Sequence, residues 1–270
     1  MNLVYNSDIL PVAAFSLAPT NRAFQYGDGL FETIRYQDKK IWFWPHHYAR
    51  LRAGMNALQL NVPDPFGADD LHSMMLALLT QNGLTPGPAR LKLQVWRGPG
   101  GLYTPTTHTA HWLLTASPTQ PFAVTHKPNL GFFSDLRLYP SVVSPYKTLN
   151  ALPYVLAGLY RQQRQLDEVV LLDTHGHLAE CVASSLFWVK AGLLHTPSLE
   201  TGCINGIIRQ QLIRTWPVQE GLFLPAVLNT AEAVFCANVN GIQTLLGTLP
   251  ADVQPFTDRL LGGRGVRSPT

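Results

Sequence analysis

The apolar positions in the first part of the chain predict a hairpin followed by a helix. Residues 30–36 (LFETIRY) and 41–44 (IWFW) are rich in aromatic and β-branched side chains and flank a polar turn at 37–40, so we expect two paired strands. Pro45 stands where a helix can begin. An apolar stripe at intervals of three and four then predicts an amphipathic helix. The stripe consists of Tyr48, Leu51, Met55 and Leu58, and Arg50 lies one residue away from it.

A second helix and two further strands are predicted before a domain boundary. The helix begins near Asp69 and Asp70 and ends at Asn82 and Gly83. Its apolar stripe is Leu71, Met74, Met75, Leu78 and Leu79. Alternation at Leu91, Leu93 and Val95, and again over residues 111–116, predicts strands. The Pro-rich segment SPTQP at 117–121 predicts a smaller N-terminal α+β domain over 1–117, a linker at 118–122 and a larger C-terminal domain over 123–270.

The pattern after the linker predicts one helix and several strands. Pro153 begins a helix that carries Leu152, Val155, Leu156 and Leu159. The runs at 168–173, 177–190 and 192–197 are separated by short turns and predict a meander of strands. The last residues, 261–270, are typical of a solvated tail.

Composition narrows the class of protein. The 270 residues are 46% hydrophobic and 14% charged, which is typical of a folded globular chain. The net charge of +3 comes without basic runs, so no nucleic-acid partner is expected, whereas a small anionic ligand is compatible. Three widely spaced cysteines and the lack of a leader or an 18-residue apolar run favour the cytoplasm, with no zinc site and no membrane segment.

Lys147 is a candidate for imine chemistry because of its surroundings. It lies in SPYKTLN, between Pro145 and the predicted helix. Most lysines are solvated surface charges. Partial burial in this apolar segment would favour the neutral amine, which is the nucleophile in Schiff-base chemistry.

Glu180 is a candidate because it lies within an apolar strand. By the two-residue period it shares a face with Leu178, Val182, Leu186 and Trp188, and a buried carboxylate needs a partner. A salt bridge or a strand-end charge is the ordinary interpretation. The functional alternative is a protonated ring nitrogen, which an anion keeps protonated so that the ring can accept electrons.

The segment TGCINGIIRQQLI at 201–213 predicts a helix whose first amide groups are available to an anion. The N–H groups near Gly206, Ile207 and Ile208 would suit a phosphate, and Arg50 could add a charge-assisted contact. Adjacent His46 and His47 lack the spacing of a metal pair. The glycines of residues 98–105 match no nucleotide-binding motif and predict a mobile loop, at a substrate entrance if functional.

Together, six motifs resemble the class IV aminotransferase-like (fold type IV) enzymes that use pyridoxal 5'-phosphate. They occur in the family's order between residues 22 and about 213. The motifs are FQYGDGLFETIR, HHYARL, KTLN, DEVVLLD, AECVASSLFWVK and NGIIR. The resemblance implies a two-domain α+β fold with the active site between the domains, and a homodimer.

The resemblance also assigns roles to individual residues. It implies that Lys147 forms the Schiff base, that Glu180 serves the pyridine nitrogen, and that Arg50 binds the phosphate. The backbone after Gly206, at Ile207 and Ile208, would hold the same phosphate. Substrate contacts are expected at Phe31, Glu32 and Tyr103, and no metal is expected.

Within the family, YGDGLFET and KTLN are similar to the branch of D-amino-acid aminotransferases and 4-amino-4-deoxychorismate lyases. The Glu-Cys pair, the LFW run and NGIIR favour the lyase, which forms 4-aminobenzoate, a folate precursor. Ala151 and Ser185 depart from the lyase pattern of Arg and Asn. An aminotransferase acting on D-amino or branched-chain amino acids with a 2-oxo acid acceptor is the alternative. A non-catalytic binding protein of the same fold is the third.

Overall fold

The computed structural model describes residues 1–249 and 253 and shows two compact units. The N-terminal unit contains residues 1–121 together with 146–151, and the C-terminal unit contains 122–145 and the described residues from 152 onwards. The sequence predicted a single boundary at 118–122. The segment 146–151 differs because its backbone pairs with residues 29–31 of the N-terminal unit. The predicted tail at 261–270 lies outside the described residues.

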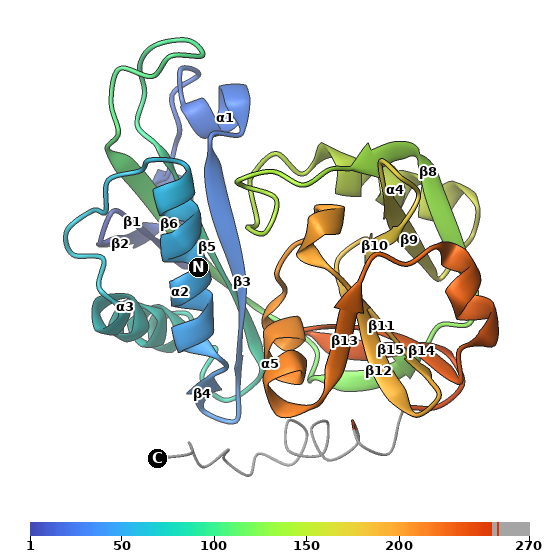
Figure 1. Cartoon of the computed structure of the whole chain (residues 1–270). Coiled ribbons are helices and arrows are strands. Elements are labelled where there is room, and N and C mark those ends of the chain that lie inside the picture. Colours follow the sequence, from blue (N-terminus) through green and yellow to red (C-terminus); the bar gives the residue numbers. More distant parts are fainter. Residues whose placement is uncertain (250–252, 254–270) are drawn as a thin grey trace. The chain divides into compact units, whose positions relative to one another are not determined.

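The N-terminal unit is built on a six-stranded sheet in the order β2-β1-β6-β5-β3-β4, with every neighbouring pair antiparallel (Figure 1). Its strands are β1 (Asn2–Tyr5), β2 (Asp8–Pro11), β3 (Gly29–Gln37), β4 (Lys40–Ile41), β5 (Ala89–Arg97) and β6 (Ala110–Pro118). Its helices are η1 (Val12–Ala14), α1 (Arg22–Tyr26), α2 (Trp44–Ala57) and α3 (Ala68–Gln81).

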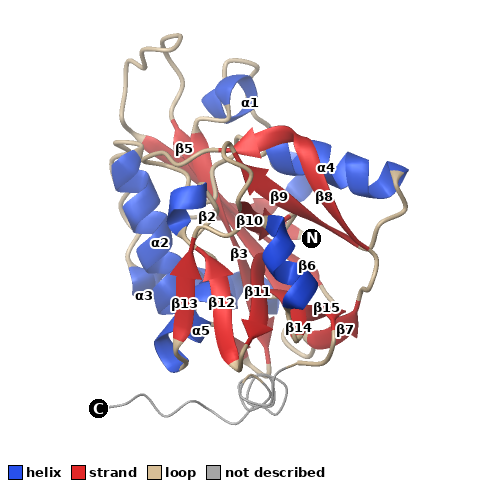
Figure 2. Ribbon diagram, turned by 45° about the vertical axis from the view of Figure 1, so that its right-hand side comes forward, coloured by secondary structure: helices blue, strands red, loops and turns tan. Residues whose placement is uncertain are grey.

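Helices α2 and α3 pack against this sheet and form the core of the unit (Figure 2). Leu30 and Ile34 of β3 lie in the same buried cluster as Leu51 and Met55 of α2. Gly54 allows this close approach, because a Cβ there would lie 2.8 Å from the Leu30 side chain. The predicted helices are therefore confirmed, since their apolar stripes face the sheet.

The predicted strand at 41–44 is wrong beyond its first residue. Strand β4 ends at Ile41. Phe43 has a left-handed backbone (φ 53°) and is the N-cap of α2, which begins at Trp44 with Pro45 in its first turn. A left-handed residue turns the chain sharply, so the aromatic content of this run serves the helix start instead of a strand.

The C-terminal unit contains a three-stranded sheet in the order β10-β9-β8 and a six-stranded sheet in the order β13-β12-β11-β14-β15-β7. Its strands are β7 (Ala123–His126), β8 (Leu130–Leu138), β9 (Glu168–Asp173), β10 (Leu178–Cys181), β11 (Ser185–Lys190), β12 (Leu193–Pro197), β13 (Val218–Gly221), β14 (Ala233–Asn238) and β15 (Gly241–Leu246). Its helices are α4 (Leu152–Gln163), η2 (Leu199–Thr201), α5 (Ile207–Thr215) and η3 (Pro225–Thr230).

The predicted meander over 168–197 is wrong, because β10 and β11 belong to different sheets. The Cys181 N–H donates to the Ser184 carbonyl at 2.9 Å, and this turn splits the run that the sequence pattern presents as one strand. The two-residue period therefore does not carry Glu180 onto the face of Leu186 and Trp188. Glu180 is buried for another reason, which is its position in the short strand β10.

Helix α4 begins where Pro153 predicted it, but the apolar stripe used to predict it is exposed. Its outward side chains are Leu152, Val155, Leu156 and Leu159, which are 37 to 58% exposed. The residues that pack into the unit are Tyr154, Ala157 and Tyr160. The inward face thus carries two phenol rings.

The three cysteines, Cys181, Cys203 and Cys236, are free thiols buried in the C-terminal unit. Within the described part of the chain, none of the helices combines the length and apolar character needed to cross a membrane.

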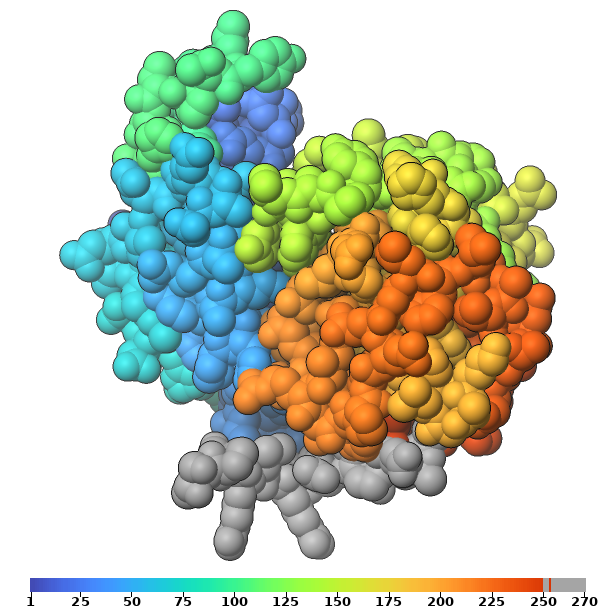
Figure 3. Space-filling view, in the orientation of Figure 1, coloured from blue at the N-terminus to red at the C-terminus, as the bar shows by residue number. Residues whose placement is uncertain are grey.

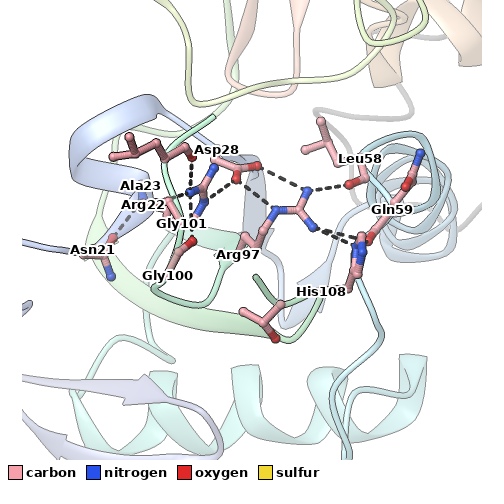
Figure 4. Close-up of polar contacts among 12 residues, drawn as sticks. Asn21, Arg22, Ala23, Asp28, Leu58, Gln59, Arg97, Gly100, Gly101 and His108 are labelled. Carbon is pink, nitrogen blue, oxygen red and sulfur yellow. Dashed lines mark hydrogen bonds and ion pairs between the residues drawn. The ribbon is translucent and has the colours of Figure 1, made fainter. Parts of the chain in front are cut away.

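A buried charge network in the N-terminal unit fixes the loop at 98–105 (Figure 4). The Asp28 carboxylate accepts from Arg22 Nε at 2.8 Å and from Arg97 Nε at 2.9 Å. Arg22 Nη1 also donates to the carbonyls of Gly100, Gly101 and Leu102. Figures 1 and 3 show the loop, in green, beside α1, in blue. The predicted mobile loop is therefore anchored at its glycine end by one guanidinium group.

Asp28→Asn is expected to lower the free energy of unfolding by about 3 kcal/mol, because Arg22 and Arg97 would stay buried without their carboxylate. Urea unfolding measures this loss. Cleavage within the loop by a protease should become faster at the same time. The exposed Asp38, in the β3–β4 turn with φ 53°, offers the control Asp38→Asn. Equal stability of the two variants would contradict a stabilising role for the network.

Candidate active site

Lys147 is held beside the start of β3 by backbone hydrogen bonds on both sides of it. The Phe31 N–H donates to the Lys147 carbonyl at 2.8 Å, and the Leu149 N–H donates to the Gly29 carbonyl at 2.9 Å. The Lys147 Nζ atom lies 4.6 Å from the centroid of the Phe31 ring. The half-buried amine is therefore fixed in place by a segment distant in sequence.

A second lysine lies over the same ring. Strand β5 places Lys92 opposite Thr33, so its side chain is on the same face of the sheet as Phe31. Lys92 Nζ is 5.3 Å from the Phe31 centroid. Burial, aided by the nearby charge of Arg90, lowers the pKa of Lys92. Sequence reasoning missed this residue, although a lysine between Leu91 and Leu93 was a visible signal.

On the other face of β3, Glu32 forms a buried ion pair with Arg50 of α2. Arg50 donates from Nε to Glu32 Oε1 at 2.8 Å and from Nη2 to Oε2 at 2.6 Å. His47 Nδ1 lies 2.7 Å from Glu32 Oε2. Glu32 and His47 are at most 1% exposed, so both charges of the ion pair are held out of water with a third polar partner.

The protonation states of this triad follow from burial and charge. Burial raises the pKa of Glu32, but the charge of Arg50 and the hydrogen bonds from His47 and Arg50 outweigh it and bring the pKa from 4.5 down to about 2. Burial lowers the pKa of His47 more than Glu32 raises it, and the charges of Arg50 and Lys147 lower it further. Neutral His47 therefore donates from Nδ1 to the carboxylate, and its buried Nε2 has no partner among the described residues.

The substrate contact expected for Glu32 stays a prediction, and in this structure the Glu32 side chain is buried. Phe31 and Glu32 are adjacent and point to opposite faces of β3. Both carboxylate oxygens of Glu32 bind Arg50. We assign Glu32 and His47 to positioning Arg50, a role that sequence reasoning missed although HHYARL contains both His47 and Arg50.

Tyr103 lies on the loop at 98–105 and is 91% exposed, with its ring 5.7 Å from that of Tyr26. The contacts of Tyr103 and Phe31 with a substrate stay predictions.

In the C-terminal unit, Glu180 is a buried acid with two hydrogen-bond donors. Its Oε1 atom accepts from the Tyr154 hydroxyl at 2.7 Å and from the Ile204 N–H at 3.0 Å. Glu180 is 4% exposed. Burial, aided by the Glu180 charge, raises the pKa of the Cys203 thiol to about 12, so the neighbouring thiol is neutral and adds no second negative charge.

Helix α5 begins at Ile207 with Gly206 as its N-cap, and no side chain caps it. The first intrahelical hydrogen bond runs from the Gln210 N–H to the Gly206 carbonyl, so the N–H groups of Ile207 and Ile208 precede the helical ladder. A Cβ at Gly206 would lie 2.5 Å from the Ser185 hydroxyl oxygen. Glycine is therefore needed for the turn to pass this close to β11.

Comparison with known proteins identifies the family. Residues 29–243 match the family model described as amino-transferase class IV, which covers most of the chain. The chain belongs to this family. The fold type IV assignment made from sequence is thereby confirmed, and the protein is an enzyme of the class IV aminotransferase and lyase group.

Relatives of this class IV family member differ in activity. The chain is 26% identical over 250 residues to a D-alanine aminotransferase of Listeria monocytogenes, covering 88% of this chain and 84% of the relative. It is 27% identical over 248 residues to an aminodeoxychorismate lyase of Vibrio harveyi, covering 85% and 84%.

A solved structure shares the fold. The T.th. branched-chain amino acid aminotransferase, complexed with N-(5'-phosphopyridoxyl)-L-glutamate, superposes with a TM-score of 0.86 at 21% identity, covering 97% of this chain and 95% of that one.

Pyridoxal 5'-phosphate is the cofactor of this family member, as the resemblance predicted. The residues present fit its groups. An amine at Lys147 suits the aldehyde, the buried acid Glu180 suits the ring nitrogen, and the α5 amides beside the Gly206 turn suit the phosphate. That these residues and Arg50 serve the cofactor stays a proposal, developed below.

Glu32→Gln should destabilise the protein by about 3 kcal/mol at neutral pH, because it leaves the Arg50 charge buried without its anion. The pKa of Glu32 is depressed in the folded state, so its stabilisation is present above pH 4.5 and is lost as the pH falls toward 2. The stability difference between native protein and E32Q should therefore shrink over that range. Urea titrations at several pH values measure it.

The exposed Glu200 provides the control Glu200→Gln, whose stability should match the native value throughout. An E32Q deficit that stays constant from pH 6 to pH 3 would contradict the assigned ionisation of Glu32.

Proposed function

We propose that this enzyme is a lyase that converts 4-amino-4-deoxychorismate into 4-aminobenzoate and pyruvate. The similarity to the Vibrio harveyi lyase over most of both chains supports it. So do the lyase-like residues AEC and LFW, which lie on β10 and β11, and NGIIR at the start of α5.

The observation that carries the proposal is the pair of lysines that share the Phe31 ring. 4-Amino-4-deoxychorismate has two carboxylates, one on its ring and one on its enolpyruvyl group. Lys147 meets the amino group in the reaction, and Lys92 is a second, partly buried cation over the same Phe31 ring that can bind a carboxylate. D-Alanine and the branched-chain amino acids each have a single carboxylate, so they have no second carboxylate for the Lys92 amine to bind.

When bound, pyridoxal 5'-phosphate supplies an aldehyde that condenses with amines and a conjugated ring that accepts the electron pair left by a departing proton. Lys147 Nζ would hold the cofactor through its aldehyde, and the same amine would take the proton from substrate C4. Glu180 would keep the ring nitrogen protonated. Arg50 and the amides of Ile207 and Ile208 would bind the phosphate.

The atoms of the reaction balance without water or an oxidant. Removal of the C4 proton by Lys147 and cleavage of the bond between C3 and the ether oxygen make the ring aromatic. The enolpyruvate that leaves takes up a proton and becomes pyruvate. The gain of aromaticity supplies the driving force. The chemical task of Lys147 in this step is therefore the transfer of one proton.

An aminotransferase is the alternative, and the D-alanine aminotransferase of Listeria monocytogenes favours it at almost the same identity. The acceptor would then be a 2-oxo acid and the donor a D-amino or branched-chain amino acid. Lys147 would move a proton between the donor's Cα and the cofactor.

Two further properties belong to the proposal. The family resemblance implies a homodimer, which light scattering on the purified chain tests. The cytoplasmic location expected from the composition is tested by fractionation of the source cells. The folate precursor role depends on the lyase activity itself.

Borohydride reduction of the cofactor-loaded enzyme, followed by peptide mapping, should place the pyridoxyl group on Lys147. The variant Lys147→Ala should retain no reduced adduct. Lys92→Ala is the matched control, because Lys92 contacts the same ring yet should leave the adduct on Lys147. A pyridoxyl group recovered on any other lysine would overturn the assignment.

Purified enzyme mixed with 4-amino-4-deoxychorismate should release pyruvate and 4-aminobenzoate in equal amounts with no 2-oxo acid present. Lys147→Ala should lower the rate by at least about a thousandfold, because the cofactor anchor and the base are lost together. Keto acid formation that requires an added 2-oxo acid, with no pyruvate from 4-amino-4-deoxychorismate, would reject the lyase in favour of the aminotransferase.

A further inference from the structure

Helix α4 brings a phenol to the acid of the candidate active site. Tyr154 is in the first turn of α4, 26 residues before Glu180, and its hydroxyl donates to Glu180 Oε1 at 2.7 Å. The ring packs in the buried cluster that includes Ala157 and Ala179. The hydroxyl is therefore brought to the carboxylate by the packing of the helix.

The second donor comes from the backbone of the segment that leads into α5. The Ile204 N–H binds the same oxygen, Oε1, at 3.0 Å. Two donors from different elements therefore fix the direction of one carboxylate oxygen. Without these donors the Glu180 carboxylate would rotate about its last bond and would become ordered only when it binds the cofactor. That loss of entropy would lower the affinity for the cofactor.

The chemistry of the Tyr154 donor suits this role. Burial, followed by the charge of Glu180 and the hydrogen bond to it, raises the pKa of Tyr154. The phenol therefore stays a neutral donor. A neutral donor stabilises the ionised carboxylate through a charge-assisted hydrogen bond and leaves its negative charge in place for a cation.

We propose that Tyr154 is a positioning residue for the cofactor's ring nitrogen, acting through Glu180, so that loss of its hydroxyl weakens recognition of that nitrogen selectively. The inference rests on the proposed role of Glu180 and extends it to a residue outside the six motifs. It applies equally to a lyase and to an aminotransferase, since both need the protonated ring.

The test compares two cofactors in each variant of the full-length chain. The enzyme is freed of cofactor by dialysis against an amine and titrated with pyridoxal 5'-phosphate, or with the analogue in which carbon replaces the ring nitrogen. Absorbance gives each dissociation constant. The ratio of the two constants within one variant cancels any loss of folded protein, so a destabilised Tyr154→Phe still gives a usable result.

Tyr154→Phe should bind pyridoxal 5'-phosphate about tenfold more weakly and the carbon analogue as tightly as the native chain. Tyr160→Phe is the matched control, since Tyr160 lies on the same helix and in the same cluster and its ring packs on Phe133. Its ratio should be native. In a Glu180→Gln background the selective effect of Tyr154→Phe should disappear.

Four outcomes would overturn the inference. Equal losses for both cofactors would make Tyr154 a packing residue, and no loss for either would make its hydroxyl irrelevant. A selective loss in Glu180→Gln without one in Tyr154→Phe would reject Tyr154 while leaving the Glu180 assignment intact. If Glu180→Gln shows no selective loss, the assignments of both Tyr154 and Glu180 are rejected. Failure of the lyase assay alone would leave the cofactor-binding test of Tyr154 unaffected.

Discussion

The candidate site depends on the pairing of residues 147–149 with the start of β3. Two backbone hydrogen bonds, one to the Lys147 carbonyl and one from the Leu149 N–H, fix a segment that is more than a hundred residues away in sequence. Through them the Lys147 amine lies against the Phe31 ring, which the Lys92 amine also contacts. An irregular segment without this pairing would have no fixed position for its amine, because a flexible lysine side chain has about 2 kcal/mol of rotamer entropy.

Successive side chains of β3 point to opposite faces of the sheet, so neighbouring residues have different partners. Phe31 and Lys92 lie on one face, whereas Glu32 points into the helix-covered face and binds Arg50. A buried ion pair is costly unless its hydrogen bonds are complete. His47 supplies the third partner of Glu32. The arginine is therefore held by the N-terminal unit's own core.

Much of the local structure could be predicted from the sequence, because the spacing of apolar residues within one helix or strand depends only on nearby residues. Stripes spaced by three and four gave helices α2 and α3, and Gly206 followed by apolar residues gave the start of α5. The predictions that failed concerned long-range pairing, or a turn that the apolar pattern did not reveal. The bond from Cys181 to Ser184 splits one apolar run between two sheets, and no local pattern indicates that residues 146–151 join the N-terminal unit.

The inward face of α4 was missed for a related reason. Its most apolar residues, such as Val155 and Leu159, are exposed, and the face that packs contains Tyr154 and Tyr160. A hydrophobic stripe identifies the buried face only when burial is its sole purpose. Here the packed face also has to present a hydroxyl to Glu180, so a moderately polar aromatic residue takes the place of an aliphatic one.

In the role proposed for Glu180, its carboxylate has to keep its negative charge, and a phenol at Tyr154 suits that requirement. An arginine or lysine in that place would hold the carboxylate firmly, but its own positive charge would offset the field that a protonated ring nitrogen needs. A second carboxylate would make one of the two take up a proton. A neutral hydroxyl and a backbone N–H, both on Oε1, orient the group without cancelling its charge. Because burial and the Glu180 charge both raise the pKa of the phenol, that donor also keeps its proton.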